Sequence, residues 1–166
     1  MYQIGDQVVY STHGVCRVVA QEQKVVDRKN VTYLALEPID KSGSRFMVPT
    51  HNEAAMAKIR PMLNMEQWQE LFNSPQIHEA QWVPVDNRRK LVYRELLANG
   101  DRLKILEMIC NVYRHKELQY AAGKKVHLCD DNFLRDGERI IAGELAIVMD
   151  VPYPEALAYL RQQLQT

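Results

Sequence analysis

The sequence lacks several features that identify common classes of protein. Its three cysteines, Cys16, Cys110 and Cys129, are odd in number and widely spaced, so no disulfide framework is expected. No run reaches the roughly 18 apolar residues that a membrane-spanning helix needs. The first residues show no charged segment followed by an apolar one, so we expect no signal peptide. Three free thiols favour a reducing compartment, and we therefore expect a cytoplasmic protein.

Sequence motifs for catalysis and for metal binding are also missing. We find no nucleophile elbow, no P-loop, no glycine-rich dinucleotide motif and no carboxylate pair with catalytic spacing, so we do not expect an enzyme. His127 and Cys129 follow His115 and Cys110 without CxxC or HxxxH spacing, and we expect neither a metal nor a cofactor. A hydrolase that uses Cys129 and His127 is the weakest alternative. The 21 basic and 21 acidic residues balance, so overall charge gives no sign of nucleic-acid binding.

What is present is an ordinary globular composition that changes character near residue 62. Hydrophobic residues make up 46% of the chain and charged residues 25%. Turn residues at 27–30 and 40–44 separate short segments that are rich in β-branched residues. Because closing a small sheet removes its exposed edges, we predict a small antiparallel β-barrel in residues 1–62. The expected strands are 7–10, 14–20, 31–36 and 45–49.

Residues 63–166 show helical periodicity and predict an all-α bundle, which makes the fold class α+β. In the sequence Asn99-Gly100-Asp101, we expect Gly100 to end one helix and Asp101 to cap the next. Asp130 or Asp131 is expected to cap a long helix that runs to about Met149. Pro154 is expected in the first turn of the last helix. The helix predicted at 86–98 carries its expected core positions at Leu91, Val92, Leu96 and Leu97.

The first two expected strands resemble the opening of a known domain. Residues 5–18 read Gly-Asp-Gln-Val-Val-Tyr-Ser-Thr-His-Gly-Val-Cys-Arg-Val. This resembles the Gly-Asp-x-Val-Val-Tyr-Pro-x-His-Gly-x-Gly-x-Val opening of the CarD/CdnL/TRCF RNA-polymerase-interacting domain. Ser11 and Cys16 replace the proline and glycine usual there. Further segments that resemble the family are 47–49, 58–61, 97–101 and 143–146.

The resemblance implies a bacterial transcription regulator. In such proteins a Tudor-like (SH3-like) barrel binds the β subunit of RNA polymerase. The helical domain meets promoter DNA near the upstream edge of the melted region and stabilises the open complex. Carried over by position, the polymerase contacts are Lys24, Arg45 and Met47. The family's arginine at position 47 is methionine here, and Arg45 faces the same side two residues earlier.

The DNA contacts implied by the resemblance depart more from the family. Family members often place a tryptophan wedge directly before an Arg-Arg pair, whereas Trp82 lies six residues before Arg88. Residues 88–125 contain ten Lys/Arg and four Asp/Glu, an excess that fits a phosphate-binding face. There are three alternatives to these interpretations. Trp82 is a packing residue, the charge run is a solvated surface, or the protein is an interaction adaptor without DNA contact. We expect a monomer, with a domain-swapped dimer as the alternative. The DNA-contact candidates are Trp82, Arg88, Arg89, Lys90, Arg114, Lys124 and Lys125.

Overall fold

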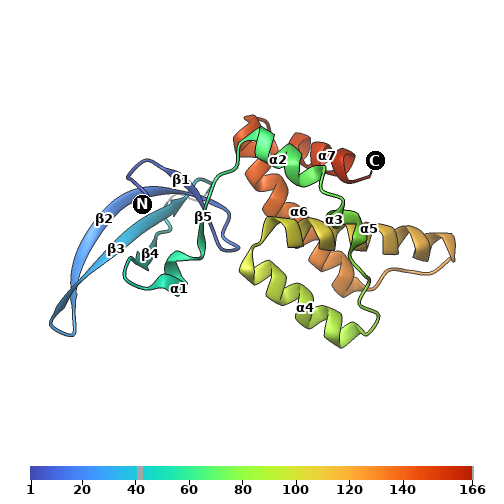
Figure 1. Cartoon of the computed structure of the whole chain (residues 1–166), viewed down its shortest axis with the longest axis horizontal. Coiled ribbons are helices and arrows are strands. Elements are labelled where there is room, and N and C mark those ends of the chain that lie inside the picture. The colour runs from blue at the N-terminus through green and yellow to red at the C-terminus, as the bar shows by residue number, and fades with distance from the viewer. Residues whose placement is uncertain (41–42, 166) are drawn as a thin grey trace. The chain divides into compact units, whose positions relative to one another are not determined.

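The computed structural model describes residues 1–40 and 43–165, and Figure 1 shows their elements. The chain forms two compact units, Met1–Met62 and a second that begins at Leu63. A five-stranded sheet followed by helices confirms the predicted α+β class. Lys41 and Ser42, in the expected turn 40–44, lie outside the described residues. The first unit contains β1 (Gln7–Tyr10), β2 (Val15–Val26), β3 (Lys29–Pro38), β4 (Phe46–Pro49), α1 (Glu53–Met56) and β5 (Ile59–Pro61).

The sheet is antiparallel and has the strand order β4-β3-β2-β1-β5. Since this order ends at β4 and β5, the described strands form a curled sheet with two edges, and not a fully closed barrel. A bulge between Val18 and Ala20 interrupts the β2–β3 register, and bulges of this kind increase local twist. One face of all five strands supplies a single core, which consists of Val8, Cys16, Val18, Leu34, Leu36, Val48 and Ile59.

The hairpin of β2 and β3 is longer than the sequence pattern predicts. Val26 pairs with Lys29, so the turn contains only Asp27 and Arg28, which have φ values of 50° and 63°. Positive φ at both positions is typical of a turn that matches the twist of the flanking strands. The end of the hairpin has no core beneath it, and Val25 is 73% exposed. This part of β2 was missed because residues 21–24 carry no apolar alternation.

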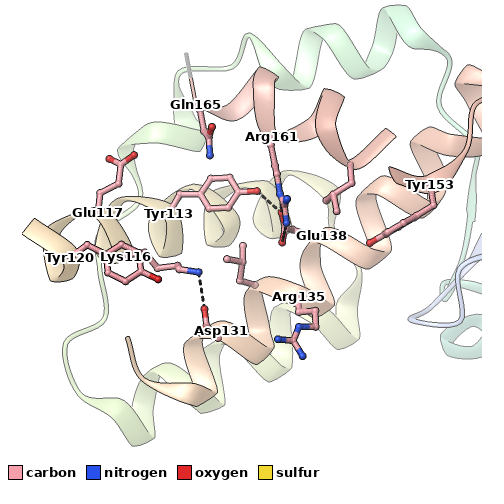
Figure 2. Close-up of a pocket in the computed structure, with 12 residues that line it drawn as sticks. Tyr113, Lys116, Glu117, Tyr120, Asp131, Arg135, Glu138, Tyr153, Arg161 and Gln165 are labelled. Atoms are coloured by element: carbon pink, nitrogen blue, oxygen red, sulfur yellow. Dashed lines mark hydrogen bonds and ion pairs between the residues drawn. The ribbon is translucent and has the colours of Figure 1, made fainter. Parts of the chain in front are cut away.

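The second unit is a bundle in which α6 packs against both α5 and α7. Its core contains Ile105, Leu106, Ile109, Ile141 and Leu145, which are fully buried side chains of α5 and α6. The three helices also line a pocket (Figure 2). The helices are α2 (Met65–Phe72), α3 (Gln76–Glu79), α4 (Asp86–Asn99), α5 (Arg102–Ala121), α6 (Leu128–Met149) and α7 (Tyr153–Leu164).

The predicted helix boundary at residues 99–101 is confirmed. Gly100 has a φ of 68° and ends α4, and the Asp101 carboxylate accepts hydrogen bonds from the backbone N–H groups of Leu103 and Lys104. The cap predicted for α6 is wrong. His127 caps this helix by accepting from the backbone N–H of Cys129, at 3.3 Å from Nδ1. Asp130 instead turns into the bundle, where it pairs with a buried arginine.

One predicted core position of α4 is also wrong. Leu91 is 59% exposed, whereas Tyr93, which the apolar pattern did not include, is 3% exposed and packs edge-on against Phe133. The helix carries few apolar residues, so the spacing of leucine and valine did not determine its buried side. Arg89 lies on the same buried side, one turn before Tyr93.

Candidate functional sites

The structure brings Lys24, Arg45 and Met47 to one face of the sheet. Leu34 and Leu36 of β3 point into the core. Because successive side chains of a strand point to opposite faces, Ala35 and Glu37 point to the other, outer face of the sheet. Met47 is the register partner of Ala35 and therefore shares this face.

Arg45 and Lys24 reach the same outer face. Arg45 forms ion pairs with Glu37 at 3.2 Å and with Glu22 at 3.1 Å. Lys24 lies two residues beyond Glu22 on β2, and its ammonium nitrogen is 5.9 Å from the centre of the Tyr33 ring. The three residues chosen from the sequence therefore form one surface, which we call the outer face.

The ion pairs of Arg45 lie in solvent, with all three side chains more than a third exposed. Exposed pairs of this kind contribute only about 0–1 kcal/mol each. The two glutamates therefore orient the Arg45 guanidinium. Acidic side chains of a binding partner can replace them with little loss of free energy. Met47 lies on β4, which stands at one end of the described strand order. Edge strands are the kind of strand to which a partner can add another strand.

Trp82 is held by ring contacts within the helical unit. Its ring stacks on His115, with centroids 3.9 Å apart and 10° between the planes. The guanidinium carbon of Arg89 lies 4.4 Å from the indole centroid. Burial lowers the pKa of His115, which favours a neutral imidazole in this stack. Trp82 is half-buried against the helical core, so these contacts agree with the packing alternative.

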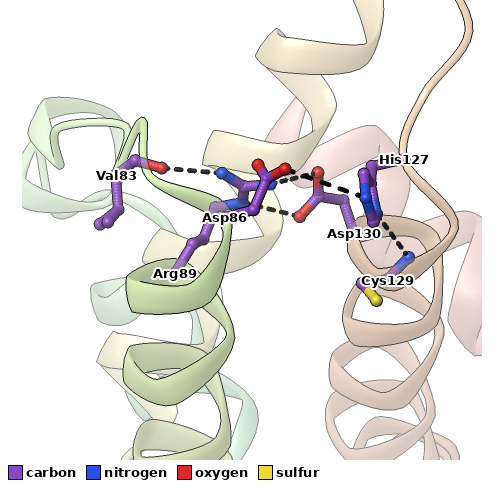
Figure 3. A network of polar contacts seen from close by, with 6 residues as sticks. All are labelled: Val83, Asp86, Arg89, His127, Cys129 and Asp130. Atoms are coloured by element: carbon purple, nitrogen blue, oxygen red, sulfur yellow. Dashed lines mark hydrogen bonds and ion pairs between the residues drawn. The ribbon is translucent and has the colours of Figure 1, made fainter.

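Arg89 does not belong to an exposed basic surface, which corrects its place among the DNA-contact candidates. Its side chain is 4% exposed. Figure 3 shows its guanidinium between Asp130, Asp86 and the Val83 carbonyl. The distances are 2.7 and 2.9 Å to the two Asp130 oxygens and 2.9 Å to each of the other acceptors. The hydrogen bond from Arg89 lowers the pKa of Asp86. Arg89 therefore holds α4 against the start of α6.

The local excess of positive charge divides into internal and surface residues. Four of the ten cations between residues 88 and 125 pair with acids: Arg89, Arg102, Lys104 and Lys116. The other six form no ion pair with a described acidic residue, and they include every basic DNA-contact candidate apart from Arg89. These six are Arg88, Lys90, Arg94, Arg114, Lys124 and Lys125.

Most of these cations lie where α4 begins, α5 ends and α6 begins. One hollow beside Trp82 is lined by Arg114 and His115. A second hollow beside Trp82 is lined by Lys125 and His127, and the His127 imidazole lies 3.9 Å from Asp86. We call this region the basic end. Arg114 and Lys125 line the hollows beside Trp82, and the basic end also includes the cations that neighbour Arg89 and Lys125 in the sequence, which are Arg88, Lys90 and Lys124.

Sequence reasoning missed the partners that organise the basic end. The spacing of Asp86 and Arg89, three residues apart on a helix, could have indicated their pairing. Asp130 is 41 residues from Arg89, and no local pattern connects them. No sequence pattern indicates that His115 stacks on Trp82. Within residues 1–40 and 43–165, no three His, Cys, Asp or Glu side chains gather as a metal site, and no helix is long and apolar enough to cross a membrane.

Comparison with known protein families identifies the first unit. The family model of the CarD-like/TRCF RID domain matches residues 2–62, which is the sheet unit together with α1. The match includes the outer face and the β4 edge, and it ends where the helical unit begins. Residues 2–62 of this chain therefore match a CarD-like RNA-polymerase-interacting domain.

Proposed function

We propose that this chain is a bacterial transcription regulator that binds the β subunit of RNA polymerase through the outer face and contacts promoter DNA through the basic end. The observation that carries the proposal is the family match over residues 2–62, because this domain is an RNA-polymerase-interacting module. The convergence of Lys24, Arg45 and Met47 on one face supports it further.

The proposed anchor combines charge with strand addition. Lys24 and Arg45 offer two cations to acidic side chains of the polymerase, and Met47 offers an apolar contact on β4. An added strand along β4 would supply main-chain hydrogen bonds that do not depend on side-chain identity. The cations would then determine orientation and association rate more than affinity.

The proposed role of the basic end depends on this anchor. Its cations would contact phosphates, which position a protein without reading sequence. Tethering to polymerase raises the effective concentration of the basic end at promoter DNA, so weak intrinsic DNA affinity suffices. Binding that favours the open complex over the closed one stabilises the open complex by that difference in affinity.

The anchor is tested by capture of purified RNA polymerase on the immobilised full-length chain. We expect the double variant Lys24→Glu, Arg45→Glu to reduce capture by tenfold or more, because both cations of the outer face become repulsive. Lys58→Glu is the control for a charge reversal elsewhere in the sheet unit, since Lys58 is exposed and is not one of the three residues of the outer face. Equal capture by the double variant and the wild type would overturn the proposed anchor.

The alternative is a polymerase-bound adaptor that does not contact DNA. The packing of Trp82 and the zero net charge favour it. Salt dependence separates the two functions, since phosphate contacts release counterions and weaken steeply as salt rises. For the regulator, the variant Lys124→Glu, Lys125→Glu should weaken the binding of the polymerase-bound chain to promoter DNA and reduce its salt dependence. No change in either quantity would favour the adaptor.

A further inference from the structure

The pocket between α5, α6 and α7 is separate from both proposed surfaces. It has a volume of about 500 Å³, within the range of small-molecule sites, and Figure 2 shows the side chains that line it. No residue of the outer face or of the basic end lines it. The proposed function therefore does not use this pocket.

The deepest acid of this pocket is already satisfied by internal donors. Glu138 is 6% exposed and accepts hydrogen bonds from the Tyr113 hydroxyl and from Arg161 Nε, both at 2.7 Å (Figure 2). Burial raises the pKa of Tyr113, and the hydrogen bond to Glu138 raises it further, so the phenol stays protonated as a donor. At the other side of the pocket, Asp131 pairs with Lys116 at 2.9 Å.

The lining groups that have no partner among the described residues are mainly hydrogen-bond donors, and they face solvent. Arg135 forms no hydrogen bond or ion pair with a described residue, and Figure 2 draws no dashed line to it. The hydroxyls of Tyr120 and Tyr153 likewise have no hydrogen-bond partner among the described residues. The one lining acid without a described partner is Glu117, which Figure 2 shows on the opposite side of the pocket from Arg135. The pocket near Arg135 therefore offers hydrogen-bond donors to an anionic ligand.

The walls of the pocket offer rings and apolar side chains. Tyr120 is 64% exposed and Tyr153 is 41% exposed, although both line the pocket. Leu134 and Leu157 supply the apolar lining beside them. Such walls suit a flat ring, because aromatic faces stack on one another and bury area with little loss of side-chain freedom.

We propose that this pocket binds a small organic anion in which a phosphate or carboxylate group is joined to a flat ring. The anionic group accepts hydrogen bonds from Arg135 and from the part of the Arg161 guanidinium that Glu138 does not occupy. The ring lies against Tyr153 or Tyr120. The Glu138 carboxylate does not oppose the anion strongly, because its charge is compensated by Arg161 and Tyr113.

The test is to titrate the full-length chain with four probe molecules and to measure binding by calorimetry and by amide NMR shifts. Adenosine monophosphate and benzoate represent the two kinds of anion, and adenosine and inorganic phosphate carry the ring or the charge alone. We expect adenosine monophosphate or benzoate to shift residues 113–120 and 153–161 and to bind at least tenfold more tightly than adenosine or inorganic phosphate. Arg135→Gln should weaken this binding about tenfold, the loss of one charged contact. Tyr153→Phe should weaken it less.

The controls separate the pocket from general charge. Arg139→Gln removes an exposed cation of α6 that does not line the pocket, and Lys124→Glu, Lys125→Glu alters the basic end. Neither control should change the affinity. Absence of binding by both ring-bearing anions at millimolar concentration would overturn the proposal. Binding that Arg135→Gln leaves unchanged, or that inorganic phosphate reproduces with equal affinity, would also overturn it.

Discussion

The two units of this protein differ in where their charged side chains lie. The sheet unit keeps its ion pairs in solvent, as in the Arg45 pairs with Glu22 and Glu37. All described polar or charged residues that are buried lie in the helical unit, and these are Arg89, Glu107, Asn111, Asp130, Glu138 and Glu144. Charged residues of the outer face can therefore be assigned to a surface from the sequence. In the helical unit, a count of cations from the sequence includes buried, ion-paired arginines as well as cations on the surface.

Helix α6 is the centre of the internal network in the helical unit. Asp130 fastens it to α4 through Arg89, and Glu144 fastens it to α5 through Arg102. Glu138 joins it to both α5 and α7. Because buried charges lose their hydration, each such pair contributes little net stability while intact, but the loss of one partner leaves an uncompensated charge. The comparison therefore predicts large effects in the helical unit and small ones in the sheet.

The largest effect is expected for Asp130→Ala. It leaves the Arg89 guanidinium buried without its carboxylate, and we expect a loss of about 3–5 kcal/mol in the free energy of unfolding. Urea unfolding followed by tryptophan fluorescence measures it, since Trp68 and Trp82 are the two tryptophans of the chain and both lie in the helical unit. Asp131→Ala, which breaks a half-exposed pair with Lys116, is the control and should cost under about 1 kcal/mol. Equal losses would remove the distinction between the two kinds of pair.

The next effect concerns packing between α5 and α6. A Cβ added at Gly137 would lie 2.7 Å from Met108 Cε and 3.2 Å from Ile109 Cγ1. Gly137→Ala should therefore destabilise the helical unit by about 1–2 kcal/mol, because the isoleucine must move. A Cβ at Gly143 meets nothing within 4 Å, so Gly143→Ala should stabilise it by about 0.5–1 kcal/mol. Thermal unfolding of the two variants tests the opposite signs, and a stabilising Gly137→Ala would contradict the close contact.

A smaller effect is expected from the buried thiols, one in each unit. Burial raises the pKa of Cys110 to about 11 and that of Cys16 also to about 11. Because the unfolded chain releases the thiol proton near pH 9, stability should fall as pH rises from about 9 toward 11, by about 1 kcal/mol per thiol at pH 10. Cys110→Ala should flatten the pH dependence of tryptophan-detected unfolding between pH 8 and 10. An unchanged slope would show that the Cys110 thiol does not control it.

The smallest effect is expected on the outer face. Glu22→Gln removes one of the two acids that hold Arg45, and we expect a change in unfolding free energy below about 0.5 kcal/mol. Hydrogen exchange of the sheet amides, read by mass spectrometry, measures the sheet unit separately. A loss comparable to that of Asp130→Ala would show that the sheet unit also depends on its ion pairs.

Local sequence signals predicted the parts of the fold that depend on neighbouring residues. The glycine and aspartate at 100 and 101 mark a helix boundary because each acts within one turn. Leu91 and Tyr93 were misassigned because α4 is buried partly through an arginine, which no apolar pattern includes. The cap of α6 was misplaced because Asp130 pairs with Arg89, which lies 41 positions away and which no local pattern connects to it.

The candidate sites follow the same division. The sequence could place residues 24, 45 and 47 on one face of the sheet, because side chains two residues apart on a strand share a face and the register puts Lys24 on the same face as Met47. The basic end was predictable only as an excess of charge. Which cations reach its surface depends on the three-dimensional pairing of Arg89, Arg102, Lys104 and Lys116.

The most direct test of the proposed division of labour is the lifetime of the open promoter complex formed by RNA polymerase with this protein. We predict that the wild-type chain prolongs this lifetime. The double variants Lys24→Glu, Arg45→Glu and Lys124→Glu, Lys125→Glu should each abolish the effect, although only the first of them should reduce capture of polymerase. A basic-end variant that prolongs the lifetime as much as the wild type would show that the basic end does not act on promoter DNA.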